Sequence, residues 1–370
     1  MIIPFLNFSP MHSVIKAEMQ EAFNRVYESN WFVLGKELEQ FENAYSNFNE
    51  VKRTVGLSNG LDALHLALKA CGVGVGDEVI VPSNTYIATV FAVSYVGATP
   101  VFVEPNKETY NIDPNRIEAA ITSKTKAIMP VHLYGQACEI TAIMELAKKY
   151  RLYVIEDNAQ SQGARFDGKI TGSWGDINAT SFYPGKNLGA LGDAGAVTTN
   201  SDELAQKVRV FRNYGSRKKY YNEVIGHNMR LDELQAALLS VKLKRLNEWT
   251  AQRQQIAAWY EDALKYAEGI ILPKIAKGAT HVYHLYVIRT NKRDELQKYL
   301  NDNGLGTLIH YPIPPHLQEA YKELGCKKGD FPIAEEIAKT ALSLPIWPGM
   351  THAEVLLVSE TISNFIIERG

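Results

Sequence analysis

Short apolar runs alternate with helix-like stretches over the first half of the chain. The runs end in turn residues and have the length of buried strands, at Glu78–Pro82, Thr99–Glu104, Ala127–His132 and Leu152–Asp157. Apolar positions at near-helical spacing occur between them, as at Leu61, Leu64 and Leu68 and in Ile140–Tyr150. This alternation predicts an α/β fold with a mostly parallel central sheet that helices cover on both faces.

The hydrophobic pattern changes near residue 245. An amphipathic helix is predicted from about Leu231, and it is expected to leave the first domain near Arg245–Trp249. The elements predicted beyond it are a strand at His281–Thr290, a helix at Arg293–Gly304 and a last helix at His352–Glu368. We therefore predict a large domain over residues 1–245 and a smaller α+β domain over residues 246–370.

Charge and composition exclude several classes of partner. The chain has 39 basic and 41 acidic residues and no long basic block, which disfavours nucleic acid and anionic membranes as partners. It shows neither a signal-peptide pattern nor an apolar run long enough to cross a bilayer. Cys71, Cys138 and Cys326 are far apart and form no CxxC pair, so we expect reduced thiols, a cytoplasmic location and no metal site.

A glycine-rich segment, Ser181–Asn200, carries the first candidate for catalysis. Lys186 lies there between Pro184–Gly185 and Gly189, in a predicted turn. A lysine amine held in a cavity can lose its proton through desolvation and then attack an aldehyde. The pattern by itself also fits a solvated lysine in a loop.

A carboxylate at the end of a predicted strand is the second candidate. Asp157 ends Leu152–Asp157, and ligand groups in open α/β sheets lie at strand carboxyl ends. A pyridoxal 5′-phosphate (PLP) ring needs an anion beside its nitrogen to stay protonated. Gln160 follows within reach of the ring hydroxyl, although Asp157 could equally cap a helix.

Two further segments fit the same cofactor. Ser58, Asn59 and Gly60 precede an amphipathic helix, whose free N–H groups and dipole suit a phosphate. Tyr86 follows a predicted strand and could stack on the pyridine ring. An ordinary capped helix and a core tyrosine remain the alternatives for these positions.

The order of these segments resembles the DegT/DnrJ family of nucleotide-sugar aminotransferases. The strings that carry the resemblance are SNGLDAL, VIEDNAQSQGA, SFYPGKNLGALGDAGAV and GHNMRLDELQAA, and it extends through nearly the whole chain. The resemblance implies the type I aspartate-aminotransferase fold, PLP with pyridoxamine 5′-phosphate as its amino form, and a homodimer with shared active sites. Relatives with histidine at the Lys186 position perform dehydration, so the lysine favours transamination.

The resemblance also implies a role for each candidate residue. Lys186 is expected to form the Schiff base with PLP and to move the proton, and Asp157 to hold the pyridine nitrogen. The other expected cofactor contacts are Gln160 to the ring hydroxyl, Asn59, Gly60 and Ser181 to the phosphate, Tyr86 to the ring face, and Asn228 to the cofactor phosphate of the neighbouring subunit.

The implied substrates are glutamate and a nucleotide-linked keto-sugar, most similar to those of enzymes that aminate C-3′ of dTDP-3-keto-6-deoxyhexoses. The candidate sugar contacts are Trp31, Gly35, Tyr183, His310, Tyr311 and His316, and the basic cluster Arg217, Lys218 and Lys219 is a candidate diphosphate contact. A proline-fixed turn with buried histidines and a solvated basic loop remain the structural alternatives.

Three other functions share features with this sequence. One is a C-4′ aminotransferase acting on a dTDP-, UDP- or GDP-4-keto-6-deoxysugar, because neighbouring keto positions differ only in pocket shape. Another is a PLP-binding regulator without turnover, which the intact Asp157, Gln160 and Lys186 disfavour. A dinucleotide-dependent oxidoreductase is disfavoured because its glycine pattern, Gly72–Glu78, follows a helix and precedes a strand.

Overall fold

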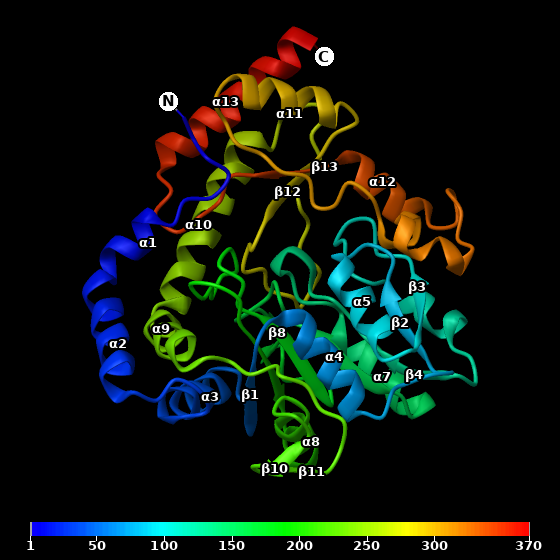
Figure 1. Cartoon of the computed structure of the whole chain (residues 1–370). Helices are drawn as coiled ribbons and strands as arrows, with labels where there is room; N and C mark the ends of the chain where they lie inside the picture. The colour runs from blue at the N-terminus through cyan, green and yellow to red at the C-terminus, as the bar shows by residue number, and fades with distance from the viewer. Residues whose placement is uncertain (1, 370) are drawn as a thin grey trace.

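A seven-stranded sheet forms the centre of the larger part of the molecule, in a computed structural model that describes residues 2–369 (Figure 1). Its strands, in spatial order, are β1 (Arg53–Leu57), β9 (Gly195–Thr199), β8 (Ile177–Ser181), β5 (Tyr153–Asp157), β4 (Thr125–Ile128), β2 (Glu78–Pro82) and β3 (Thr99–Val103). Among these strands β9 alone runs against the others, because it pairs antiparallel with both β1 and β8. The carboxyl ends of the other six strands therefore lie along one edge.

Side chains alternate between the two faces of this sheet, and helices cover both faces. Val79 and Val81 of β2 pack with α4 (Gly60–Ala70), α5 (Ile87–Tyr95) and α8 (Asp202–Phe211). Ile80, between them, packs on the opposite face with α7 (Ile140–Tyr150). Burial on both faces explains why these strands are continuously apolar in sequence. The predicted α/β fold with a mostly parallel sheet is confirmed.

Helices α2 (Lys16–Ser29), α3 (Lys36–Phe48) and α9 (Glu233–Leu243) form a layer beside β1 and β9. α9 contacts both α2 and α3, and the short helix α1 (Ser9–Val14) precedes α2. Phe182, which follows β8, lies in this layer with its ring edge on to Tyr45 and Phe41, at centroid distances of 5.1 and 5.4 Å. The chain thus enters the Lys186 segment from a fully buried aromatic anchor.

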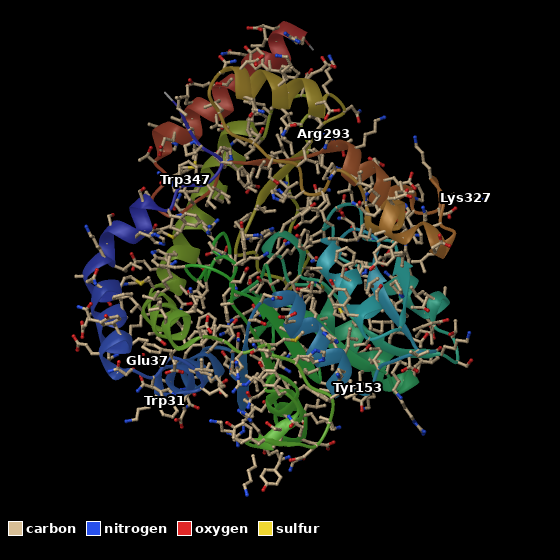
Figure 2. All side chains as sticks on the ribbon, in the orientation of Figure 1. Trp31, Glu37, Tyr153, Arg293, Lys327 and Trp347 are labelled. Carbon is tan, nitrogen blue, oxygen red and sulfur yellow. The ribbon has the colours of Figure 1, made fainter. Side chains whose placement is uncertain are left out.

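The C-terminal part has its own hydrophobic cluster. It combines α10 (Leu246–Leu264), α11 (Arg293–Asp302) and α13 (His352–Arg369) with the antiparallel pair β12 (Tyr286–Arg289) and β13 (Ala341–Leu344), and α12 (Pro332–Thr340) precedes β13. The fully buried Ile3 belongs to this cluster as well, and its N–H donates to the carbonyl of Gly304 at 2.9 Å. Trp347 packs in the same cluster, where the N-terminal segment approaches α13 (Figure 2). The proposed division at residue 245 stays a prediction, and the first residues lie with the C-terminal part.

Several predicted elements differ from the observed ones. The helix expected from Leu231 is two helices, α9 and α10, because the chain turns at Lys244–Arg245 and passes from α2 and α3 to α13. The predicted strand His281–Thr290 is extended only over Tyr286–Arg289. The residues before β12 bond instead to the loop after β4, with Val282 N–H donating to Gly135 O at 2.9 Å.

We expect Phe182→Ala to destabilise the protein by about 3–5 kcal/mol, because the deletion leaves a cavity among rigid aromatic rings. Denaturant unfolding of the apo protein measures this change. Tyr266→Ala is the control, since 87% of that residue is exposed and removal of its side chain should change the free energy of unfolding by less than about 0.5 kcal/mol. Equal effects of the two substitutions would contradict the burial of Phe182 among Tyr45 and Phe41.

Candidate active site

A cavity of about 720 Å³ lies at the carboxyl edge of the sheet, and both parts of the chain line it. The end of β5 contributes Asp157, the loop after β8 contributes Lys186, and the N-terminus of α4 contributes Gly60. The C-terminal part contributes Arg253 and His310. Residues more than 250 positions apart in sequence are therefore brought to one cavity by the parallel strand ends and by the segment before β12.

Asp157 is held in a fixed position at the bottom of this cavity. Only 6% of the residue is exposed, and its carboxylate accepts hydrogen bonds from Thr89 Oγ1 at 2.8 Å and from the Ala159 N–H at 3.1 Å. Burial raises the pKa of Asp157, while these two donors and the charge of Lys186 act in the opposite direction. A buried carboxylate of this kind is suited to pair with a cationic ring nitrogen.

A second buried carboxylate fixes the chain next to Asp157. Glu156 is fully buried and accepts hydrogen bonds from the N–H groups of Gly172, Trp174 and Gly175 at 2.7–3.0 Å and from His132 Nε2 at 2.7 Å. Burial alone would raise the pKa of Glu156, but these donors lower it below its usual value. The strand end that carries Asp157 is therefore tied to a neighbouring loop.

Lys186 is the reactive amine of the cavity. Desolvation lowers its pKa to about 8, and the negative charge of Asp157 opposes that decrease. The neutral, nucleophilic form is thus far more populated near neutral pH than for a solvated lysine. Its loop is tied to the rest of the site by Asn187 Nδ2, which donates to Val282 O at 2.9 Å.

A tight backbone approach forms another part of the cavity lining. Asn59 caps α4 by accepting a hydrogen bond from the Asp62 N–H at 2.8 Å. A Cβ at position 60 would lie 2.6 Å from Ser181 Cβ, so glycine is required for α4 to approach the end of β8. A helix N-terminus beside a serine hydroxyl suits a phosphate group.

Other polar residues that line the cavity are neutral. Gln160 Nε2 donates to the hydroxyl of Tyr311 at 3.1 Å, and the Tyr311 ring lies 5.2 Å from that of Tyr86. Burial raises the pKa of Tyr311, which keeps its phenol protonated. Burial, together with the positive charge of Lys186, lowers the pKa of His310 to about 4, so its imidazole is neutral at pH 7 and can exchange hydrogen bonds with a ligand.

The structure places the predicted site residues in two groups. Those that line the cavity are Asn59, Gly60, Tyr86, Asp157, Gln160, Ser181, Tyr183, Lys186, His310 and Tyr311. Those that lie outside it are Trp31, Gly35, Arg217, Lys218, Lys219, Asn228 and His316. The cofactor candidates other than Asn228 are thus together, and they fit PLP: an amine, an anion for the ring nitrogen, an aromatic ring and a phosphate cradle.

His316 is buried in a different environment from the one expected. Its Nε2 lies 3.1 Å from Glu335 Oε1, and its ring packs on Phe331 at a centroid distance of 4.8 Å. Gly35 and Trp31 contact each other rather than the cavity, and the N–H of Gly35 donates to Glu233 at 2.7 Å. Figure 2 shows Trp31 at the edge of the molecule, where 62% of it is exposed.

Sequence reasoning missed three polar residues of this site. Thr89 lies three residues after Tyr86, one helical turn along α5, and that spacing could have suggested that both face the cofactor. Arg253 and His284 line the cavity from α10 and from the segment before β12. No local pattern distinguishes Arg253 from other polar residues of its helix.

Comparison with known proteins identifies the family. The profile of the DegT/DnrJ/EryC1/StrS aminotransferase family matches residues 13–363. The chain belongs to this family. The predicted family, aminotransferase activity and PLP cofactor are thereby confirmed. A relative from Bacillus subtilis, ntda, has a crystal structure with bound PMP. It has a TM-score of 0.91 at 32% identity, over 98% of this aminotransferase and 85% of its own chain.

Three relatives are especially similar to this aminotransferase. The dTDP-3-amino-3,6-dideoxy-α-D-galactopyranose transaminase of Aneurinibacillus thermoaerophilus is 52% identical over 98% of this chain and 99% of its own. The crystal structure of Streptomyces venezuelae DesV has a TM-score of 0.97 at 45% identity, covering 99% of this chain and 98% of that one. A protein of Geobacillus stearothermophilus named as a pleiotropic regulatory protein is 47% identical over 99% of both chains.

The pH dependence of Lys186 reactivity is a direct test of this geometry. We expect the rate at which a small aldehyde modifies Lys186 in the apo protein to rise with a midpoint near pH 8, because only the neutral amine reacts. Asp157→Asn should move that midpoint to lower pH, since the substitution removes the charge that stabilises the ammonium form. Mass spectrometry of the Lys186 peptide measures the rate, and a midpoint near 10.5 would show a solvated lysine instead.

Proposed function

We propose that this aminotransferase transfers an amino group from glutamate to C-3′ of a dTDP-linked 3-keto-6-deoxyhexose. The observation that carries the proposal is the placement of Lys186, with its pKa lowered to about 8, in one cavity with the buried Asp157. The Aneurinibacillus relative, and a 46% identical relative from Streptomyces venezuelae that covers 98% of this chain, are both named as transaminases of dTDP-3-amino sugars. These names support C-3′ rather than C-4′.

The chain's own residues supply binding, orientation and proton transfer. When bound, PLP supplies the carbonyl carbon that accepts the amine and a ring that withdraws electrons. Lys186 Nζ takes the proton from the donor's Cα and later delivers one to the sugar carbon, and its pKa near neutrality suits transfer in both directions. Asp157 would hold the ring nitrogen in its protonated form, and the Thr89 hydroxyl holds the Asp157 carboxylate in place.

Neutral side chains around Lys186 suit an uncharged sugar. Tyr183 lies on the cavity wall with 59% of its surface exposed, and His310 and Tyr311 are half-buried hydrogen-bonding groups contributed by the C-terminal part of the chain. We propose that these three residues contact the sugar ring. Trp31, Gly35, Arg217, Lys219 and His316 are outside this chain's own cavity, so any contact that they make must come through another subunit or through their neighbours.

We also propose a homodimer in which each site is completed by the partner. Asn228 is exposed and lies outside the cavity of its own chain, in the segment that contains Arg217 and Lys219. Exposed apolar side chains accumulate on α2 and in the loop from α2 to α3, at Phe23, Tyr27, Trp31, Phe32, Val33 and Leu34, as expected for an association surface. No described helix is long and apolar enough to cross a membrane. We keep the cytoplasmic location as part of this proposal, supported by the three free cysteines.

Separate half-reactions test the reaction and its position. Protein loaded with PLP is converted to the amino form with glutamate, freed of donor, and mixed separately with dTDP-3-keto- and dTDP-4-keto-6-deoxyhexose. We expect rapid return of the PLP absorbance with the 3-keto sugar alone. Lys186→Ala should bind PLP but lose at least about 100-fold in turnover, because its proton carrier is missing. Return with the 4-keto sugar alone would overturn the position, and no response to any amino donor would favour the regulator.

Shared sites can be tested by mixing two inactive variants. Lys186→Ala and Asn228→Ala homodimers should each have little activity. Co-refolded mixed dimers should recover about a quarter of normal activity, since half of the dimers are mixed and each contains one intact site. Light scattering gives the oligomeric state in parallel, and dimers without recovery would show that Asn228 acts within its own chain.

A further inference from the structure

One wall of the cavity contains an arginine that is removed from solvent and has no carboxylate partner. Arg253 of α10 is 2% exposed, and Arg253 Nη1 donates to three backbone carbonyls, those of Tyr283 at 3.1 Å, His284 at 3.5 Å and Ile346 at 3.2 Å. Among residues 2–369 no carboxylate lies within 4.0 Å of its guanidinium. Buried charges in folded proteins are ordinarily paired, so this cation lacks a counter-ion.

The same wall has two further hydrogen-bonding atoms without partners. Arg253 Nε and His284 Nδ1 are both buried, and neither makes a hydrogen bond within the described part of the chain. Both residues line the cavity. Burial lowers the pKa of His284 well below its usual value, with further lowering by Lys186 and Arg253, so its neutral ring can donate from Nδ1 without adding charge. A cation with a free N–H, next to an imidazole with a free ring nitrogen, forms a site for a small anion.

We propose that Arg253 and His284 bind the α-carboxylate of the amino donor. The inference rests on the proposed function and adds the recognition of the donor to it. An α-carboxylate is bonded to the carbon that bears the transferred amine, so it must lie close to Lys186. Arg253 and His284 line the same cavity as Lys186, and the charge of Lys186 contributes to the lowered pKa of His284.

A sugar diphosphate suits this wall less well than a carboxylate does. A diphosphate carries more than one negative charge and is joined to a nucleoside, so it requires several cations and a route to solvent. Arg253 is a single, deeply buried cation whose Nη1 is already engaged by backbone carbonyls. Its remaining N–H groups match one planar carboxylate.

Measuring the two half-reactions separately tests this role. For Arg253→Gln we expect kcat/KM for the glutamate half-reaction to fall about 100-fold, as is typical for loss of a charge-assisted hydrogen bond in a buried site. The half-reaction with the amino sugar should change by less than about 3-fold. Arg253→Lys keeps the cation and should restore part of the donor rate. Equilibrium binding of glutarate, a dicarboxylate that has no amine, should weaken in Arg253→Gln as well.

Glutamate α-amide identifies which carboxylate is recognised. The α-amide should react slowly with the unaltered protein, because it lacks the α-carboxylate. Arg253→Gln should not slow its reaction further, because the contact between carboxylate and guanidinium is already absent. Additive losses would overturn the assignment to the α-carboxylate. Losses confined to the amino-sugar half-reaction would instead assign the wall to the diphosphate.

Arg212→Gln is the matched control for a purely structural effect. Arg212 is a buried arginine outside the cavity, paired with Glu42 Oε1 at 2.6 Å and bonded to Gly56 O at 2.7 Å. Its loss should lower the melting temperature without changing the ratio of the two half-reactions. If Arg253→Gln behaves like this control, the inference is wrong. If the unaltered protein fails in both half-reactions, the proposed function fails instead.

Discussion

The site depends on a carboxylate and an amine that are placed in one partly desolvated cavity. Removal from water raises the pKa of Asp157 and lowers that of Lys186, while their mutual attraction partly restores both charges. These opposing effects on the two pKa values depend on the distance between the groups, so both side chains must be held in place. The Thr89 hydroxyl and the Ala159 N–H fix Asp157, and the bonds of Glu156 fix the strand end beside it. The end of β5 and the groups bonded to it therefore hold the Asp157 carboxylate in place.

The C-terminal part of the chain contributes polar residues to the cavity. The segment before β12 is not part of the strand, and its N–H groups bond to the loop after β4. His284 of this segment lines the cavity. Arg253 holds that segment and the residue Ile346 through its carbonyl bonds. One buried arginine thus joins the segment before β12 to Ile346, and its Nε is left without a partner.

The sequence predicted most of the elements because their physical causes are local. Strands buried on both faces read as short apolar runs, which is why β2 and β5 were found within a residue of their observed bounds. Helix α7 was predicted at its observed limits from periodicity alone. The break between α9 and α10 was not predicted, because no glycine or proline marks it and the turn follows from packing against α2, α3 and α13.

The reactive residues of the cofactor site could also be predicted from short stretches of sequence. The other polar residues that line the cavity could not. Lys186 and Asp157 lie within short strings whose turn residues and strand ends specify where such groups can point. By sequence alone His316 looked as suitable as His310, but only His310 lines the cavity, whereas His316 is buried against Phe331 and Glu335. Arg253 carried no signal, because its burial, its missing counter-ion and its place beside Lys186 arise only when α10 meets the segment before β12. The sequence determined the fold class and the reactive groups through local propensity, while the tertiary structure decided which distant polar residues share their cavity.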